Sequence, residues 1–267
     1  MEKIKLIAID LDDTLLHDDL TISARAKKDI REVIAQGITV TLATGRMFAA
    51  ALPYARELEL DVPLITYQGA MVKYVNGRII HHQTLPLEVA QKVIDLVRPY
   101  GYHVNIYVDD ELFMEQDSPE GRHYVSITKV PPKYVDVGSF DQLWAEPTKL
   151  VILAEDEKLK LLAKELNQKF KGMLNINRTL PCLLEMTHYQ ADKGNALKAL
   201  AESLDLQAEN VMAIGDSPND VEMIKYAGFS VAMENAIPQL KEQVDYVTLS
   251  NNDDGVAEVL EKFVLTV

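Results

Sequence analysis

The sequence predicts an α/β fold with a mainly parallel sheet, interrupted by an inserted α+β unit. Short, continuous apolar runs alternate with amphipathic helical patterns in the first 80 residues and again from residue 193 onward. Such runs are typical of strands buried on both faces, and strand–helix alternation of this kind indicates parallel βαβ units. Between the two stretches, hairpin signals are interleaved with helices, which is typical of antiparallel α+β structure.

The first stretch is predicted to begin with a strand and to continue in βαβ order. Its elements are a strand at residues 4–9, a helix at 23–36, a strand at 38–43, a helix at 48–58 and a strand at 63–66. Ser23 is a suitable N-cap for the first helix, and Gly37 is suited to end it. Residues 72–74 and 78–81 then flank an Asn-Gly turn, which predicts a hairpin.

The inserted unit is predicted at residues 85–187, and residues 1–84 and 188–267 form one core that is split in sequence. The insert's expected elements are paired strands at residues 103–108 and 112–114, a strand at 149–154, a helix at 157–170 and a hairpin of residues 173–177 and 182–186. The core resumes with a helix at 193–204, a strand at 211–214, a helix at 220–227, strands at 230–233 and 244–249, and a helix at 256–263.

Composition narrows the possible partners. The chain has 27 basic and 41 acidic residues, a net charge of −14. Such a surface repels nucleic-acid phosphates and anionic lipid, so we expect neither a nucleic acid nor a membrane as partner. No apolar run approaches the roughly 20 residues that span a bilayer, and the N-terminus shows no secretory signal. Cys182 is the only cysteine, which excludes an intrachain disulfide; we expect it in the core of a soluble, cytoplasmic protein.

Acidic residues cluster where two predicted strands end. Residues 10–14 (Asp-Leu-Asp-Asp-Thr) follow the first strand, and residues 215–220 (Gly-Asp-Ser-Pro-Asn-Asp) follow a later one. Open α/β sheets bind their ligands beyond the carboxyl ends of strands, where such loops converge. A single acidic residue there would usually be a helix N-cap. Two clusters would repel each other unless a cation neutralised them, and oxygen ligands alone favour Mg²⁺.

Two further segments suit an anion such as a phosphate. Thr44-Gly45-Arg46 ends a predicted strand and offers a hydroxyl, backbone N–H groups and a cation. Lys193-Gly194 opens a predicted helix, where the ammonium group and the helix dipole both favour negative charge. Each signal alone is weak, since small polar turns are common and a lysine at a helix start is usually solvated.

Together, in order along the chain, these four segments resemble the four motifs of the haloacid dehalogenase superfamily. Residues 227–236 are similar to the closing run of its Cof-type branch, whose members carry a C2-type cap between the second and third motifs. The resemblance covers essentially the whole core. It implies a Rossmann-like three-layer core with a mainly parallel sheet, and it agrees with the position of the predicted insert.

The resemblance also implies a role for each motif residue. Asp10 would be the nucleophile and Asp12 the general acid and base. Mg²⁺ would be bound by Asp10, Asp12 (through its carbonyl oxygen) and Asp216. Asp220 and Arg46 would support these groups indirectly. Phosphate oxygens would be held by a further set: Leu11, Thr44, Gly45, Lys193 and Asn219.

This reading implies a Mg²⁺-dependent phosphatase for small phosphorylated metabolites, sugar phosphates first, acting through an aspartyl-phosphate. A phosphotransferase or mutase with the same intermediate is the nearest alternative. A phosphoacceptor receiver module is another, but such modules are much shorter and leave the insert unexplained. Repeated turnover of para-nitrophenyl phosphate would separate an enzyme from a receiver. We expect a monomer or a weak homodimer.

The sequence departs from the family pattern at two positions near the expected substrate entrance. Gln68 stands where asparagine is usual before Gly-Ala, and Glu234 stands where a small residue is usual before Asn-Ala. The insert is expected to act as a cap that closes over the carboxyl ends of the core strands, with hinges near residues 84–86 and 187–191. The cap and the entrance would select the leaving group, and no sequence motif in either region identifies that group.

Overall fold

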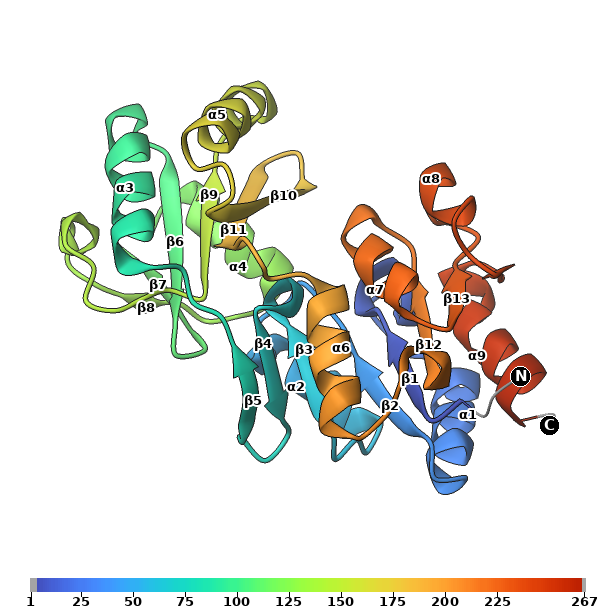
Figure 1. The fold of residues 1–267 in the computed structure, drawn as a ribbon. Coiled ribbons are helices and arrows are strands. Elements are labelled where there is room, and N and C mark those ends of the chain that lie inside the picture. The colour runs from blue at the N-terminus through green and yellow to red at the C-terminus, as the bar shows by residue number, and fades with distance from the viewer. Residues whose placement is uncertain (1–3, 266–267) are drawn as a thin grey trace. The chain divides into compact units, whose positions relative to one another are not determined.

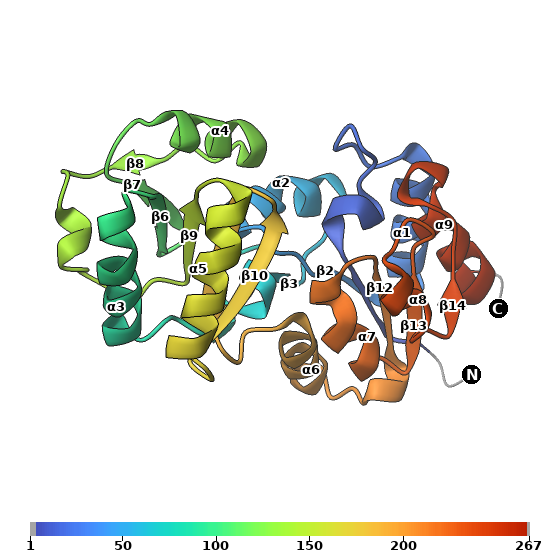
Figure 2. The same ribbon diagram turned by 90° about the horizontal axis from the view of Figure 1, so that it is seen from above.

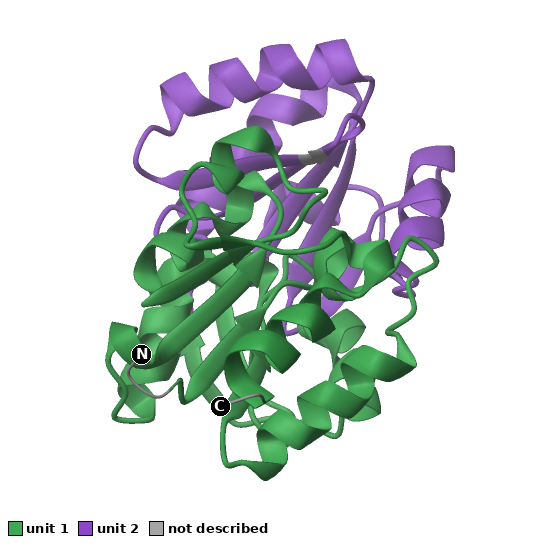
Figure 3. Cartoon of the chain, turned by 90° about the vertical axis from the view of Figure 1, so that its right-hand side faces the viewer, with its two compact units in different colours: residues 1–81, 192–267 green, residues 82–191 purple. Residues whose placement is uncertain are grey.

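The computed structural model describes residues 4–265, except for the side chain of Thr179. It divides into two compact units, which are coloured separately in Figure 3. The core unit comprises residues 1–81 and 192–267, and the insert unit comprises residues 82–191. The boundaries predicted from the sequence, at 84/85 and 187/188, lie a few residues from these. No helix within residues 4–265 is both long enough and apolar enough to cross a membrane.

The core unit is built on a parallel sheet, as predicted. Its strands run in the order β14-β13-β12-β1-β2, and all four neighbouring pairs are parallel. Their bounds are β1 (Leu6–Ile9), β2 (Thr39–Leu42), β12 (Val211–Gly215), β13 (Phe229–Ala232) and β14 (Tyr246–Val247). Leu6 is paired with Val211 on one side and with Thr39 on the other, so β1 is central.

A second, three-stranded sheet continues the core beyond β2. Its order is β3-β4-β5, with the bounds β3 (Pro63–Thr66), β4 (Met71–Tyr74) and β5 (Ile79–His82). A parallel bridge between Ala43 and Ile65 joins β3 to the end of β2. The hairpin predicted around Asn76 and Gly77 is confirmed by β4 and β5, and Gly77 takes the positive φ of 96° that this turn requires.

Helices cover both faces of the parallel sheet and complete the three layers. Figure 2 shows α1 and α9 on one face, and α6 and α7 on the other. The bounds are α1 (Ala24–Ala35), α2 (Phe48–Glu57), α6 (Lys193–Ser203), α7 (Val221–Tyr226), α8 (Pro238–Lys241) and α9 (Gly255–Leu260). The predicted N-cap is confirmed, because the Ser23 hydroxyl accepts a hydrogen bond of 3.0 Å from the Ala26 N–H.

The insert unit is an α+β unit around one six-stranded sheet (Figure 1). The strand order is β10-β11-β9-β6-β7-β8, antiparallel except for the last pair. Its strands are β6 (His103–Val108), β7 (Glu111–Met114), β8 (Lys133–Tyr134), β9 (Lys149–Leu153), β10 (Leu174–Leu180) and β11 (Leu183–His188). Its helices are α3 (Leu87–Val97), α4 (Pro119–Thr128) and α5 (Asp156–Lys169). Both predicted hairpins are present, whereas α3 and α4 were not individually predicted.

The two faces of the insert sheet differ in composition. One face carries apolar side chains, among them Ile106, Leu150 and Leu184, which pack with α3 and α5 into one hydrophobic core. Because side chains alternate along a strand, their neighbours point to the opposite face. We call that side the polar face, although buried apolar side chains (Leu112, Met114, Val151, Leu153 and Leu183) also lie on it; its polar residues are Asn105, Tyr107, Lys149, Asn175, Asn177, Glu185 and Thr187.

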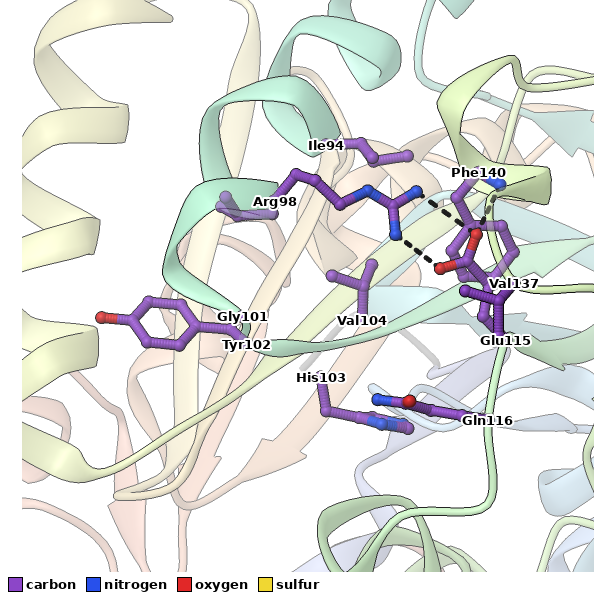
Figure 4. A pocket seen from close by; sticks show the side chains of 11 residues that line it. Ile94, Arg98, Gly101, Tyr102, His103, Val104, Glu115, Gln116, Val137 and Phe140 are labelled. Carbon is purple, nitrogen blue, oxygen red and sulfur yellow. Dashed lines mark hydrogen bonds and ion pairs between the residues drawn. The ribbon is translucent and has the colours of Figure 1, made fainter.

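A small cavity of about 130 Å³ lies beside α3 and the start of β6 (Figure 4). Its charged groups satisfy one another. Glu115 accepts a hydrogen bond of 2.6 Å from Arg98 and another of 2.7 Å from the Phe140 N–H. His103, which also lines the cavity, is bonded to Asn105 and Ser118. These contacts brace the insert core.

One expectation for the insert is wrong. Cys182 was expected within a core strand, but it lies in the turn between β10 and β11 and is partly exposed. The apolar pattern runs through this turn without a break in hydrophobicity, and Pro181 before it was the overlooked turn signal.

Candidate active site

The site forms where two adjacent parallel strands end. Asp10 follows β1 and Asp216 follows β12, and these strands are paired from Leu6–Val211 to Ile9–Ile214. Carboxyl ends of parallel neighbours meet at one sheet edge, which brings the two acids together as the sequence predicted. Asp220 joins them, and carboxylate oxygens of the three residues lie within 4.8 Å of one another.

Lys193, at the first residue of α6, ties this cluster together. Its side chain is fully buried, and its Nζ donates to Asp10 Oδ1 and to Asp220 Oδ1, both at 2.6 Å. A solvated lysine at a helix start, the ordinary alternative, is therefore excluded. The ammonium group instead bridges the two acidic segments, which lie far apart in the sequence.

Asp220 is held mainly by backbone groups. Its Oδ2 accepts hydrogen bonds of 3.0 Å from the N–H groups of Asp216 and Ser217. Gly215 makes this possible, because a Cβ there would lie 2.6 Å from the Asp220 side chain. The motif thus folds back on itself, and Asp220 fixes the loop that carries Asp216.

The three carboxyl groups of the cluster outnumber the ammonium group of Lys193, and this excess contributes to shifted pKa values. Burial raises the pKa of Asp10 well above its usual value; Lys193 opposes this, and Asp220 and Asp216 add to it. Burial and the charge of Asp220 raise the pKa of Asp216 to about 7. Burial alone would lower the pKa of Lys193, but Asp10 and Asp220 outweigh it and raise that pKa. The cluster therefore has a deficit of positive charge, which a cation or protons must balance.

The residues present fit a magnesium ion. The cluster of Asp10, Asp216 and Asp220 consists of carboxylates only, and hard oxygen ligands are those that Mg²⁺ prefers. The Thr14 hydroxyl donates a hydrogen bond of 2.9 Å to Asp216 Oδ1, which orients that carboxylate. Asp220 is a member of the acidic cluster in the same way as Asp216. The resemblance, in contrast, implied only an indirect role for Asp220.

Asp12 points away from this cluster. Arg46 contacts both of its oxygens, with Nε at 3.0 Å from Oδ2 and Nη2 at 2.5 Å from Oδ1. Arg46 also reaches the hydroxyl of Tyr54 on α2, at 3.3 Å. The Asp12 side chain is 47% exposed, whereas Asp10 is buried, so Asp12 is accessible to solvent. The Asp12 carboxylate is not part of the acidic cluster, which agrees with the backbone role that the resemblance implies for it.

The predicted phosphate-binding residues lie on the turns around the cluster. Thr44 is buried, and its hydroxyl accepts a hydrogen bond of 3.1 Å from the Arg46 N–H, which shapes the turn around Gly45. Leu11 directly follows Asp10. Asn219 lies between Asp216 and Asp220 in the last motif, and its Nδ2 donates to Gln68 Oε1 at 2.8 Å.

Sequence reasoning assigned no role to three residues that contact the site. Thr14 was part of the first motif, four residues after Asp10, and this spacing was its only signal. Gln68 was noted only as a departure from the family pattern. Tyr54 had no signal, because its contact with Arg46 depends on where α2 packs.

Comparisons with known proteins agree with this geometry. The family model for haloacid dehalogenase-like hydrolases matches residues 7–260. The 5-amino-6-(5-phospho-D-ribitylamino)uracil phosphatase YcsE of Bacillus subtilis is 33% identical, over 98% of this chain and 96% of YcsE. The crystal structure of TM0651 from Thermotoga maritima superposes with a TM-score of 0.88 at 35% identity, covering 97% of each chain. A haloacid dehalogenase-like hydrolase from Bacteroides thetaiotaomicron gives a TM-score of 0.90 at 32% identity, over 97% of this chain and 99% of the other.

The chain therefore belongs to the haloacid dehalogenase-like hydrolases, and within them it is a phosphatase of the Cof type. The family resemblance stated from the four motifs is confirmed, as is the predicted α/β fold with an added α+β unit.

Proposed function

We propose that the protein is a Mg²⁺-dependent phosphatase that hydrolyses small phosphorylated metabolites, sugar and polyol phosphates above all, through an aspartyl-phosphate on Asp10. The observation that carries this proposal is the cluster of Asp10, Asp216 and Asp220 around a single buried ammonium, that of Lys193. Three acids and one cation leave the site short of positive charge, and a phosphate ester alone would worsen that shortage.

Asp10 would form the covalent intermediate. Lys193 holds its Oδ1 at 2.6 Å, and Oδ2 would attack phosphorus as the ester P–O bond breaks. Water would then attack the same phosphorus, the bond to Oδ2 would break, and inorganic phosphate would leave. The N–H groups of Leu11 and Gly45 and the amide of Asn219 would hold the phosphoryl oxygens.

Asp12 would move the protons. It would protonate the leaving alcohol in the first step and take a proton from the attacking water in the second. Both of its oxygens are engaged by Arg46 in the present conformation, so donation to the leaving group requires the side chain to turn away from the guanidinium. Arg46 would thus hold the Asp12 carboxylate in place between the two proton transfers.

Mg²⁺, when bound, would supply the positive charge that stabilises the phosphoryl group during transfer. The residues that would hold it are Asp10 and Asp216 through their carboxylates and Asp12 through its carbonyl oxygen. Thr14 would keep Asp216 oriented. Asp220, held by Lys193 and by two backbone N–H groups, would fix the loop behind them.

The test is phosphate release from para-nitrophenyl phosphate, with Mg²⁺ and after exhaustive EDTA treatment. We expect many turnovers per molecule with Mg²⁺ and none without it. Asp10→Asn should lower kcat by at least about 10³-fold, as the loss of a nucleophile does, and should abolish covalent phosphorylation. Undiminished turnover in EDTA would contradict the metal requirement. A single phosphorylation per molecule would instead indicate a receiver.

We propose that the insert acts as a cap, and that side chains on its polar face bind hydroxyl groups of the leaving group. Asn105, Glu185 and Thr187 are each more than nine-tenths buried there. Among the described residues, Asn105 Nδ2, Glu185 Oε2 and Thr187 Oγ1 have no hydrogen-bond partner. These donors and acceptors together suit a polyol, whose hydroxyls both donate and accept. The named substrate of YcsE carries a phosphorylated ribityl chain, which is such a group.

Thr187→Val tests this recognition because it removes a hydroxyl with little change in volume. We expect the ratio of kcat/KM for sugar phosphates to that for para-nitrophenyl phosphate to fall by about 3- to 10-fold, the worth of one neutral hydrogen bond. Thr39→Val, a matched change on β2 of the core unit, is the control and should leave the ratio unaltered. A chimera that carries the insert of a relative should change the ranking of substrates but keep the Mg²⁺ requirement. An unchanged ranking in a folded, active chimera would refute the role of the insert.

A further inference from the structure

The segment after β3 is bent in an unusual way. Tyr67, Gln68 and Gly69 have φ values of 54°, 60° and 97°, so three consecutive residues lie in the left-handed region. Only glycine adopts this conformation freely, and a run of it with two other residues is strained. Strain of this kind persists where the surrounding structure holds it, and it is concentrated at functional sites.

Contacts with three of the motif turns hold this segment in place. The Tyr67 N–H donates to the Arg46 carbonyl at 2.8 Å, and the Gln68 N–H donates to the Thr44 carbonyl at 3.1 Å. A side chain on Gly69 would overlap the carbonyl of Asp192, the residue before Lys193. The strained segment therefore lies against the second and third motifs.

The Gln68 side chain makes the third connection. Its Oε1 accepts the 2.8 Å hydrogen bond from Asn219 Nδ2 in the last motif. Asn219 in turn accepts from the Ser217 hydroxyl through Oδ1, which leaves its Nδ2 facing Gln68. This chain of bonds fixes the orientation of the Gln68 amide, with the oxygen toward Asn219 and the nitrogen on the other side.

The nitrogen of this amide is buried with its donors unused. Gln68 is 2% exposed, and Nε2 has no hydrogen-bond partner among the residues that the structure describes. It lies directly over Gly45, where even a Cβ atom would overlap it. A buried donor without an acceptor is unfavourable, and an anion is the acceptor that best suits a neutral amide N–H. The turns on both sides, at Gly45 and at Asn219, are those to which phosphate binding was assigned.

We propose that Gln68 is a catalytic residue whose Nε2–H donates to a non-bridging oxygen of the phosphoryl group, in the substrate and during transfer. Asn219 holds the amide in the required orientation, and the bend at residues 67–69 brings it there. This inference rests on the proposed function. An asparagine at this position, one methylene shorter, would bring its amide less far toward Gly45.

The experiment separates phosphate contact from a merely structural role. Gln68→Glu keeps the side-chain length and an oxygen acceptor for Asn219 but removes both N–H donors. Gln68→Met removes the acceptor as well and adds no charge. For each variant we would measure binding of inorganic phosphate by calorimetry with Mg²⁺ present, and kcat and KM for para-nitrophenyl phosphate. Thermal unfolding would report whether each variant is folded.

We expect both variants to bind phosphate at least about 10-fold more weakly and to lose on the order of 10²-fold in kcat, the usual effect of losing a donor aimed at a reacting oxyanion. Gln243→Glu is the matched control, because that glutamine is exposed and donates to the carbonyl of Gln239. It should behave as wild type. If Gln68→Glu does not fold, Gln68→Met carries the same test.

If Gln68→Glu binds phosphate and turns over as wild type does, Gln68 only supports Asn219 and the proposal is overturned. Wild-type behaviour of a folded Gln68→Met overturns it as well. A wild-type protein that neither binds phosphate nor releases it from esters would instead refute the proposed function. The two failures are thus distinguishable.

Discussion

Each unit of this molecule buries a lysine, and the two lysines differ in what surrounds them. In the core unit, Lys193 contacts Asp10 and Asp220 at 2.6 Å each, and Asp216 belongs to the same cluster. In the insert unit, Lys149 on β9 contacts Glu185 on the adjacent strand β11 at 3.1 Å. The first lysine meets an excess of carboxylate, whereas the second is paired with the carboxylate of Glu185.

The difference shows that charge balance, rather than burial, distinguishes the proposed reaction site from the buried pair of the insert. A buried ion pair costs desolvation, which its own attraction offsets when the charges match. The pair of Lys149 and Glu185 matches by itself. The core cluster does not, and its raised carboxyl pKa values record the mismatch. That mismatch is what a bound cation would neutralise.

The largest effect is expected from Lys193→Met, which removes the one cation that pairs with the core cluster among residues 4–265. The free energy of unfolding should fall by about 3–5 kcal/mol, because the partner carboxylates stay buried without a counter-charge. The kcat/KM for para-nitrophenyl phosphate should fall by at least about 10²-fold. Urea unfolding and steady-state kinetics measure the two effects. Lys225→Met, which breaks only an exposed pair with Glu222, is the control. A variant with wild-type kinetics would show that Lys193 is structural only.

Lys149→Met makes the corresponding change in the insert. It should also lower the free energy of unfolding by about 3–5 kcal/mol, since Glu185 is left buried without its partner. Its kcat for para-nitrophenyl phosphate should fall by less than about tenfold, because the phosphoryl chemistry is assigned to the other unit. A loss of kcat as large as that of Lys193→Met would remove the distinction between the two lysines.

A smaller effect should appear when the metal-free protein is titrated. The pKa of Asp216 is raised to about 7, so the folded state holds a proton that the unfolded chain releases near pH 4. The stabilisation from that proton is complete below about pH 4 and is lost as the pH rises to about 7. Urea midpoints in EDTA should therefore decrease over this range. Saturating Mg²⁺ should raise the midpoints at pH 8 more than at pH 5. A flat profile in EDTA would contradict the charge imbalance.

The smallest effect is expected from replacing both members of the insert pair at once. Lys149→Met with Glu185→Leu leaves no unpaired charge, so the free energy of unfolding should stay within about 1 kcal/mol of wild type or exceed it. The difference in the free energy of unfolding between the double variant and Lys149→Met gives the cost of leaving the Glu185 carboxylate buried without its partner. If the double variant is as unstable as the single one, the pair contributes through packing rather than charge.

The sequence predicted the parallel sheet and its acidic edge well, for an identifiable reason. Residues 6–9 and 211–214 are continuous apolar runs, and buried parallel strands need that pattern on both faces. Once β1 and β12 are neighbours, Asp10 and Asp216 have to converge. The resemblance of the motifs also placed Lys193 in the predicted site. Its burial differs from the usual solvated state of a lysine at a helix start.

What the sequence did not predict depends on long-range packing. Gln68 and Asn219 are separated by 151 positions, and no local pattern links them. Arg46 meets Tyr54 only because α2 turns that ring toward it. Cys182 was misplaced because the insert's final hairpin turns within an apolar stretch. Helix α4 was missed because its apolar face is weak, with only Gly121 and Tyr124 buried.

The pairing of β1 with β12 also determines when the reaction site comes into being. Leu6 has its partner in Val211, so a chain made from its N-terminus exposes one edge of β1 until the whole insert has been synthesised. The insert sheet has no such delay, because β6 to β11 lie within one continuous segment. Until that point Asp10 lacks Asp216 and Asp220, two of the neighbours that raise its pKa in the folded protein. Pairings between distant segments form late, so the chain completes the unit that we propose selects substrates before it assembles the carboxylates that would act on them.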